Sequence, residues 1–298
     1  MTTKEMNEEL ERGVLMLDAG EYELTGPLYV GSRSGIIGEE GVVFRVRGDF
    51  PAVVAAGEKM VLRSFTVKVL CAGYSNHVIF VKDSFDVVAE RISIEPSVPT
   101  RNAGICFYGS SKLFLREACV AHARFGIFLT TNVEEARLES CDLYDCITGI
   151  YVYGKEGPCS RLFLADNRIW GRRGLGGNGE DAVLLDTCRE VYVNDNWCFR
   201  NREHGIYLSD VEGGEVCRNR CLENTVNGIQ LVGAKEIVVD RNVCCFNEYH
   251  GIYLDRCKDV ILFKNFCARN KKWGILRVES EAMTVKNYVF GNDEGEVA

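Results

Sequence analysis

The sequence is poor in several features that mark large classes of protein. It has only 5 prolines among 298 residues, and no stretch approaches the run of about 18 apolar residues that predicts a membrane-spanning helix. The N-terminal segment MTTKEMNEELERG is acidic and lacks the apolar region of a signal peptide. The net charge is −8, which argues against the large basic face of a nucleic-acid-binding protein. We therefore expect neither a membrane nor a nucleic acid as a partner.

The 14 cysteines lack the patterns that would give them a chemical role. No Cys-x-x-Cys pair occurs, so the spacing of a zinc site is missing. One position recurs as Cys198, Cys221, Cys244 and Cys267. Each of these would have two equivalent disulfide partners, which favours packing in a core over bonding. Many thiols without an export signal indicate a reducing, cytoplasmic compartment, and we expect no metal and no cofactor.

What the sequence has instead is 30 glycines and a repeat of fixed length. A short Gly-Ile block recurs along the chain, and from residue 182 onward its spacing is 23 residues. The blocks begin at Gly104, Gly126, Gly149, Ala182, Gly205, Gly228, Gly251 and Gly274. Between the blocks the pattern Asn-x-Cys-x-x-Asn recurs, as in Asn196, Cys198 and Asn201. A fixed period of this length predicts a solenoid.

Each repeat has room for short strands and bends but not for a helix. Alternating β-branched residues punctuated by Gly and Asn are typical of strands and turns. We therefore predict an all-β, single-stranded parallel β-helix of about eleven coils, a rod roughly 50 Å long at the spacing of stacked strands. Ile206 and Leu208 and their equivalents would point inward, and the asparagines would hydrogen-bond from coil to coil.

We expect one domain over residues 1–298, in three parts. Residues 1–14 would form an N-terminal cap, because residues 3–12 have a helical pattern that follows a capping box. Residues 15–292 would form the coils, and residues 293–298 an acidic tail. The sequence shows no helix that would close the C-terminal end. We expect that end to be covered by the tail or by a second subunit of a homo-oligomer.

Two stretches resemble a known group of proteins. The segment from Asp18 to Val30, followed by Gly35-Ile-Ile-Gly, resembles the start of pectin-lyase-like β-helix proteins. The Gly-Ile-Tyr-Leu coils with their asparagine ladders resemble NosD-type parallel β-helix repeats. The resemblance covers nearly the whole chain and implies a right-handed helix. It does not fix a function, because such proteins include polysaccharide lyases, glycoside hydrolases, epimerases, adhesins, virion proteins and scaffolds.

Two insertions fall in the bend before a Gly-Ile strand, three coils apart. Residues 93–103 (SIEPSVPTRNA) and 171–180 (GRRGLGGNGE) would form the walls of a groove whose floor is the strands between them. Arg101, Arg172 and Arg173 in these insertions are candidate binding residues. The alternative is two tolerated insertions without a ligand.

An outward row of residues lies between the inward Ile and Leu of each block. It reads Cys106, Phe128, Tyr151, Leu184, Tyr207, Gln230, Tyr253 and Leu276. Exposed rings along one face fit sugar rings or a protein partner. Phe128, Tyr151, Tyr207 and Tyr253 are therefore candidate binding residues. The alternative is that these rings stack only to stabilise the sheet.

An enzyme of this fold would need carboxylates near the second insertion. Glycoside hydrolysis uses two carboxylates about 5–10 Å apart, and Asp145 with Asp181 or Asp186 are the candidates, with Arg172 as the base of a lyase. The carboxylates are too sparse for the acidic cluster of a lyase, so a solvated acidic face is the stronger interpretation. His204 and His250, two coils apart, are too distant to share one metal and are interpreted as turn residues.

These observations favour a non-enzymatic structural or recognition scaffold that binds a protein or glycan partner through its aromatic face. The alternative is a carbohydrate-active enzyme, either a polysaccharide lyase or a glycoside hydrolase. The resemblance also implies a cytoplasmic or virion location, because similar proteins without a signal peptide are common among large DNA viruses.

Overall fold

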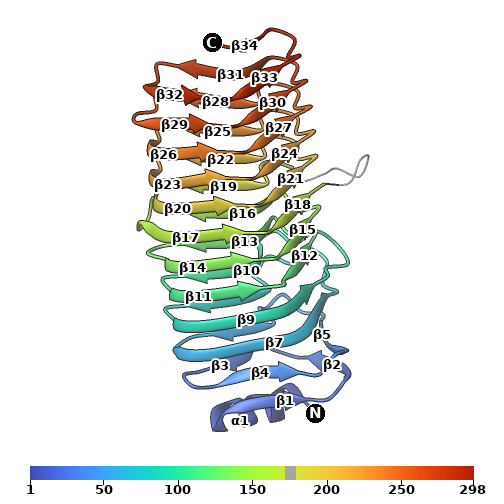
Figure 1. Cartoon of the computed structure of the whole chain (residues 1–298). Helices are drawn as coiled ribbons and strands as arrows, with labels where there is room; N and C mark the ends of the chain where they lie inside the picture. The colour runs from blue at the N-terminus through green and yellow to red at the C-terminus, as the bar shows by residue number, and fades with distance from the viewer. Residues whose placement is uncertain (172–178) are drawn as a thin grey trace.

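The computed structural model describes residues 1–171 and 179–298 as a stack of β-coils on one short helix. In Figure 1 the stack rises from the N-terminal helix at the bottom to the C-terminus at the top. Every strand pairing among these residues is parallel, between one coil and the next. None of the described helices is long and apolar enough to cross a membrane.

Helix α1 (Thr3–Arg12) covers the first coil, as the sequence predicts. Thr2 and Glu5 form the expected capping box, and Met6 and Leu10 are buried against the coil. Asn7 hydrogen-bonds to backbone groups at the open edge of the sheet. Its side chain accepts a hydrogen bond from the Tyr29 amide at 2.8 Å and donates one to the Pro27 carbonyl at 2.9 Å. The helix therefore shields the apolar end of the stack and part of its open edge.

One face of the stack is a 12-stranded sheet with one strand from each coil. The chain therefore has about twelve coils, close to the predicted eleven. The strands are β3 (Leu28–Val30), β6 (Val53–Ala55), β8 (Ile79–Lys82), β10 (Ala103–Tyr108), β13 (Phe125–Thr130), β16 (Thr148–Tyr153), β19 (Val183–Asp186), β22 (Ile206–Ser209), β25 (Ile229–Val232), β28 (Ile252–Asp255), β31 (Trp273–Val278) and β34 (Gly295–Val297). Strand β34 comes from the segment expected to be an acidic tail, and it pairs with β31.

The remaining strands form a 22-stranded sheet that bends around the stack. Two long strands, β7 (Glu58–Val69) and β9 (Phe85–Ile94), turn the corner and join its two halves. The other strands are β1 (Val14–Leu17), β2 (Gly20–Leu24), β4 (Gly35–Gly38), β5 (Val42–Val46), β11 (Ser111–Arg116), β12 (Cys119–Ala121), β14 (Glu134–Glu139), β15 (Asp142–Tyr144), β17 (Cys159–Ala165), β18 (Arg168–Trp170), β20 (Cys188–Asn194), β21 (Trp197–Phe199), β23 (Glu212–Cys217), β24 (Arg220–Leu222), β26 (Lys235–Asp240), β27 (Val243–Cys245), β29 (Val260–Phe263), β30 (Phe266–Ala268), β32 (Ala282–Val285) and β33 (Tyr288–Phe290).

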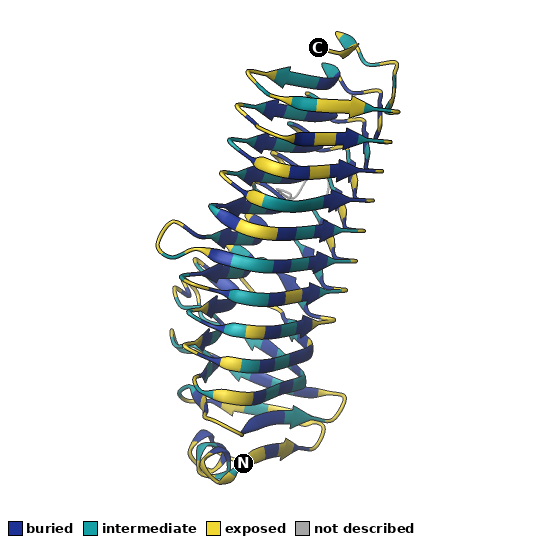
Figure 2. Cartoon of the chain, turned by 60° about the vertical axis from the view of Figure 1, so that its left-hand side comes forward, coloured by how far each residue is buried: buried dark blue, intermediate teal, exposed yellow. Residues whose placement is uncertain are grey.

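The core runs the length of the stack, and buried and exposed positions alternate along the strands (Figure 2). Ile206, Ile229 and Ile252 stack in register and are fully buried, as the repeat predicts. The recurring cysteines also face the core and are free thiols. Cys141 and Cys146 lie outside this recurring set but are also buried. Burial raises the pKa of both thiols to about 12, so both are protonated at neutral pH. These cysteines act as small core residues.

Two buried asparagine ladders fix the stacking of the coils. In the first, the side chains of successive asparagines donate to one another at 2.9–3.0 Å from Asn167 to Asn287. In the second, equivalent bonds run from Asn201 to Asn292. Most of these amides also donate to a backbone carbonyl, as Asn219 does to Val193 at 2.7 Å. The predicted bonding between asparagines is therefore confirmed, and it holds neighbouring coils in one register.

The two insertions both precede strands of the 12-stranded sheet. In the first, the Thr100 amide donates to the His122 carbonyl and the Arg101 amide to the Tyr74 carbonyl, both at 2.9 Å. In the second, the Glu180 amide donates to the Ile147 carbonyl at 2.8 Å. Arg172 and Arg173, two predicted binding residues, lie outside the described residues.

Candidate functional site

The outward row predicted from the repeat lies in register on the 12-stranded sheet. Adjacent strands pair Phe128 with Tyr151, Leu184 with Tyr207, and Gln230 with Tyr253. The rings of Phe128 and Tyr151 stack with centroids 5.3 Å apart. These side chains are half-buried rather than fully exposed. The row is thus continuous in register, but Leu184 and Gln230 lie between its rings, and Phe128 and Tyr151 are the neighbouring rings that stack.

One member of the row does not face solvent. Cys106 was expected to point outward, but only 1% of its surface is exposed. It lies between Phe80 and Phe128 in the row. The His77 ring stacks on both of these rings, with centroid separations of 5.2 and 6.4 Å, and so covers the thiol. Burial raises the pKa of Cys106 to about 12.

A second row of side chains lies at or just before the start of the strands and widens the aromatic face. It consists of His77, Ala103, Phe125, Thr148, Asp181, His204, Asn227, His250 and Trp273. A ring in this row stacks on the ring three residues later, as His204 does on Tyr207 at 5.2 Å and His250 on Tyr253 at 5.6 Å. The sequence analysis considered the histidines and the tyrosines separately and did not predict that their rings stack.

Side chains of the second row hydrogen-bond to the next coil. Asp181 Oδ1 accepts from the His204 amide at 2.9 Å, Asn227 Oδ1 from the His250 amide at 2.9 Å, and His250 Nδ1 from the Trp273 amide at 3.1 Å. His204 breaks the pattern, because its Nδ1 is buried and has no hydrogen-bond partner. These hydrogen bonds fix the orientation of the side chains in the second row, and they leave His204 Nδ1 without a hydrogen-bond partner.

The other nitrogen of His204 is held by an amide. His204 Nε2 lies 2.6 Å from Gln230 Oε1, and this oxygen also accepts a hydrogen bond from Asn227 Nδ2 at 2.7 Å. Because Gln230 Oε1 is an acceptor, Nε2 carries the proton and Nδ1 carries the lone pair. The lone pair faces Asp181, whose Oδ1 lies 3.4 Å from Nδ1.

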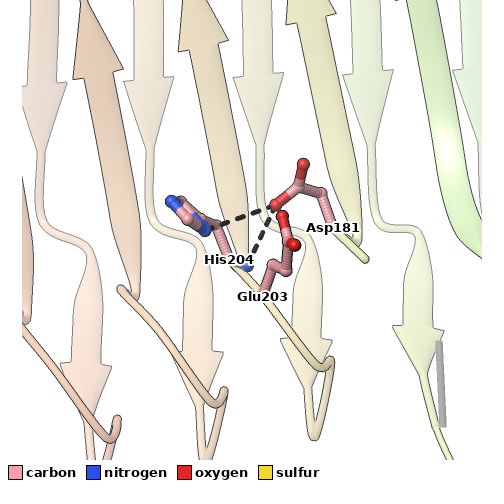
Figure 3. Close-up of side chains that lie close together, drawn as sticks. All are labelled: Asp181, Glu203 and His204. Atoms are coloured by element: carbon pink, nitrogen blue, oxygen red, sulfur yellow. Dashed lines mark hydrogen bonds and ion pairs between the residues drawn. The ribbon is translucent and has the colours of Figure 1, made fainter. Parts of the chain in front are cut away.

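Asp181, Glu203 and His204 form the candidate site (Figure 3). One oxygen or nitrogen of each lies within 4.8 Å of the others. Asp181 and His204 are 3% and 8% exposed, whereas Glu203 is exposed. Burial, together with the nearby Glu203 and Glu180, raises the pKa of Asp181 to about 7, although the hydrogen bond from the His204 amide lowers it. Burial lowers the pKa of His204 to about 4. The site therefore combines a desolvated carboxyl, a neutral imidazole and an exposed carboxylate.

The other predicted catalytic residues lie elsewhere. Asp181 precedes β19 and Asp186 ends it, so their Cα atoms are about 16 Å apart along the strand. Asp186 is paired with Lys155 at 2.9 Å. Asp145 lies in the bend before β16, three residues before Thr148. Arg172 is outside the described residues. Only Asp181 of the predicted set thus belongs to the cluster.

A second aromatic surface lies on the 22-stranded sheet, and the sequence reading did not identify it. The rings of Tyr144, Trp170 and Phe199 stack in successive coils. Arg168 lies over Trp170 and Trp197, with centroid distances of 5.1 and 5.3 Å. The adjoining groove has a volume of about 580 Å³. We call this surface the Arg168 groove.

Comparison with known proteins agrees with this architecture. The model of the NosD family, described as periplasmic copper-binding protein, matches residues 175–295, which is less than half of the chain. No curated protein sequence matches the chain. The topology and the solved structures below define the fold: the chain is a right-handed parallel β-helix.

Three solved structures illustrate the likeness. A mutant of the periplasmic alginate epimerase AlgG has a TM-score of 0.79 at 15% identity, covering 94% of this chain and 75% of that one. The surface protein and adhesin PfbA of Streptococcus pneumoniae has a TM-score of 0.75 at 11% identity, covering 99% and 95%. The A-module of mannuronan C-5 epimerase AlgE4 of Azotobacter vinelandii has a TM-score of 0.61 at 13% identity, covering 99% and 93%. At these identities the likeness shows the fold alone.

The NosD family is described as copper-binding, so we compared the side chains of this protein with the ligands that copper prefers. Cu(I) prefers thiolate and thioether ligands. Twelve of the cysteines are buried and the recurring four lie in the core, so they offer no accessible thiolate cluster. Within residues 1–171 and 179–298, the group that could hold a metal is Asp181, Glu203 and His204, which has one nitrogen and two carboxylates. The described residues do not fit a thiolate copper site.

Proposed function

We propose that this protein is a recognition scaffold that binds a glycan along the 12-stranded sheet, over the coils from Phe128 to Tyr253. The observation that carries the proposal is the double row of rings in register on this face. The coils repeat at about 4.8 Å, so Phe128 and Tyr151 lie in adjacent coils, and Tyr207 and Tyr253 continue the line with one residue between them. Aromatic faces pack on the apolar faces of sugar rings while polar groups beside them bind hydroxyls.

A polar side chain between the rings favours a glycan over a protein. Gln230, which is half-buried, separates Tyr207 from Tyr253 along the row. The rings are half-buried, so the face is not the large exposed apolar patch that marks many protein interfaces. The similar structures include alginate epimerases and an adhesin, which fits a glycan or a surface ligand. A protein partner remains an outcome of the test.

The alternative function is a carbohydrate-active enzyme, which the contact between Asp181 and His204 favours. A carboxyl beside an imidazole can serve in general acid–base chemistry. However, Asp181 is 3% exposed, and its Oδ1 already accepts the His204 amide. A group that must protonate a glycosidic oxygen has to reach the substrate. Because this carboxyl is buried, we propose glycan binding as the function and keep glycan cleavage as the alternative.

The test is a panel of acidic and neutral polysaccharides, measured for binding and for cleavage with the reduced protein. Tyr207→Ala and Tyr253→Ala should weaken binding by about three- to tenfold, the loss expected for one aromatic contact. Phe163→Ala is the matched control, because Phe163 stacks on Tyr192 at 4.7 Å on the other sheet. Equal loss in all three variants would refute the proposal. Cleavage lost in Asp181→Asn would establish the enzyme instead.

Subunit pairing through the C-terminal end and the cytoplasmic or virion location stay predictions. The last coils do expose apolar side chains, with Tyr288 and Met283 each 62% exposed.

A further inference from the structure

We propose that Asp181, Glu203 and His204 bind a divalent metal ion of the Zn²⁺ class, through one oxygen of each carboxylate and the Nδ1 atom of the imidazole. The site lies within the second row, because Asp181 and His204 belong to it and the His204 ring stacks on Tyr207. The metal would use Nδ1 and the carboxylates rather than the faces of the rings, so the two proposals can be tested separately.

The fold brings the three ligands together with the spacing that a metal needs. Asp181 and His204 occupy the same position in adjacent coils, and Glu203 precedes His204. Zinc binds nitrogen and carboxylate oxygen at about 2.0–2.2 Å, so two ligands of a tetrahedral ion lie about 3.4 Å apart. The distance from His204 Nδ1 to Asp181 Oδ1 is 3.4 Å. This distance is too long for a good hydrogen bond but suits two ligands of one ion.

The buried Nδ1 of His204 is the independent observation that points to a ligand. At the same position in other coils, His250 Nδ1 accepts the Trp273 amide at 3.1 Å and His77 Nδ1 accepts the Ala103 amide at 3.4 Å. His204 Nδ1 accepts no hydrogen bond, although its residue is only 8% exposed. A buried acceptor without a partner is costly, and a metal ion would satisfy it.

The surroundings of His204 match those of a metal ligand. Metal-binding histidines generally donate their second N–H to an oxygen that fixes the ring and its tautomer. Gln230 Oε1 takes this role at 2.6 Å from Nε2, and Asn227 Nδ2 orients Gln230 in turn. The ring is also held by its stack on Tyr207. The lone pair of Nδ1 is thus directed at Asp181 before any ion arrives.

The charge around the site favours a cation. Asp181 and Glu203 are joined by Glu180, whose Oε2 accepts a hydrogen bond from Thr148 at 3.1 Å. By contrast, the buried Asp186 at the other end of β19 is paired with Lys155. A buried carboxylate needs a compensating charge. A divalent ion would supply it to Asp181.

The ligand set selects among metals. One imidazole with two carboxylates suits Zn²⁺ and Mn²⁺, whereas Ca²⁺ takes six to eight oxygens and Cu(I) takes sulfur. Cu²⁺ binds more tightly than Zn²⁺ to most nitrogen and oxygen sites, so its binding alone would not discriminate. Three protein ligands leave a fourth position open, on the side of the exposed Glu203.

The experiment titrates chelator-treated, reduced protein with Zn²⁺, Mn²⁺ and Ca²⁺ by calorimetry and follows the melting temperature. We expect one Zn²⁺ per chain, weaker Mn²⁺ binding and no comparable Ca²⁺ binding. Saturating Zn²⁺ should raise the melting temperature by about 5 °C or more. His204→Phe keeps a ring over Tyr207 but removes the nitrogen ligand, and Zn²⁺ affinity should fall about a hundredfold or vanish.

The matched control is His250→Phe, which makes the same change two coils away and should leave Zn²⁺ affinity unchanged. Glu203→Gln alters an exposed side chain and cannot fail by unfolding the core, so it keeps the test valid if a buried variant does not fold. Absence of Zn²⁺ binding, or equal affinity in His204→Phe and the wild type, would overturn the proposal. Glycan binding could survive either outcome, so failure here is distinguishable from failure of the proposed function.

Discussion

Histidines at one position of the coil have different partners, and these partners decide what each residue does. His77 and His250 use Nδ1 to accept a backbone amide of the next coil. His204 leaves Nδ1 without a partner and directs it at Asp181. All three stack on a ring three residues later. One residue type therefore ties coils together at two places and offers a ligand at the third.

His77 gives a prediction for the pH dependence of stability. Burial lowers its pKa to about 4, below the value of about 6.5 expected in the unfolded chain. Between these values the unfolded state binds the proton and the folded state does not, so stability is lost as the pH falls from about 6.5 to about 4. His77→Phe keeps a ring between Phe80 and Phe128 and should reduce this loss.

The measurement compares urea midpoints of the wild type and His77→Phe at about pH 7.5 and about pH 5. His204 and His250 also have lowered pKa values through burial, so the variant should keep part of the dependence. An identical drop in midpoint for both proteins would show that His77 does not contribute.

For single residues, the sequence predicted side-chain directions within the strands but not in the bends before them. The tyrosines of the outward row were placed correctly, because alternate residues of a strand share a face. His204 lies three residues before Tyr207, which in a continuous strand would place it on the other face. It lies in the bend before β22, however, and there the rule of alternation fails. The contact with Asp181 and the burial of Cys106 depend on that bend, so the repeat did not reveal them.

The spacing between coils explains why glycine recurs before the inward isoleucine, a position that Ala182 takes in one coil. A Cβ atom on Gly228 would lie 2.6 Å from the Gly251 carbonyl oxygen and 2.9 Å from Asn247 Nδ2. Gly205 and Gly251 have the same close approach to the next coil. The close approach of the next coil therefore favours glycine at these three positions.

Gly228→Ala should accordingly destabilise the protein by about 1–3 kcal/mol, the usual cost of overpacking. Gly31→Ala is the matched control, because a Cβ atom there meets nothing within 4 Å. It should change stability by no more than about 0.5 kcal/mol. The check is denaturant unfolding of both variants, and similar destabilisation by the two would contradict the argument.

The elements themselves were largely predictable, because the period of 23 residues specifies one coil. The cap helix followed from its capping box and apolar face. The sequence did not predict the long corner strands β7 and β9 or the last strand, β34. These lie where the period loosens near the N-terminus or where few residues follow the last Gly-Ile block, so the repeat gives little information there.

For the whole molecule, stacking turns residues far apart in sequence into continuous surfaces. The face with the double ring row and the Arg168 groove are both aromatic, but they lie on different sheets. The ring row carries the polar Gln230 between its rings, whereas the Arg168 groove is lined by charged residues that include Asp195 and Arg218. The Arg168 groove is the competing surface for any sugar or anion that the protein binds.

The most direct test of glycan recognition is a crystal structure of the protein with an oligosaccharide chosen from the polysaccharide panel. We expect sugar rings to lie on the 12-stranded sheet and to contact Tyr151, Tyr207 and Tyr253, with hydroxyl groups hydrogen-bonded to Gln230. A sugar bound in the Arg168 groove, with the tyrosine row empty, would contradict the account.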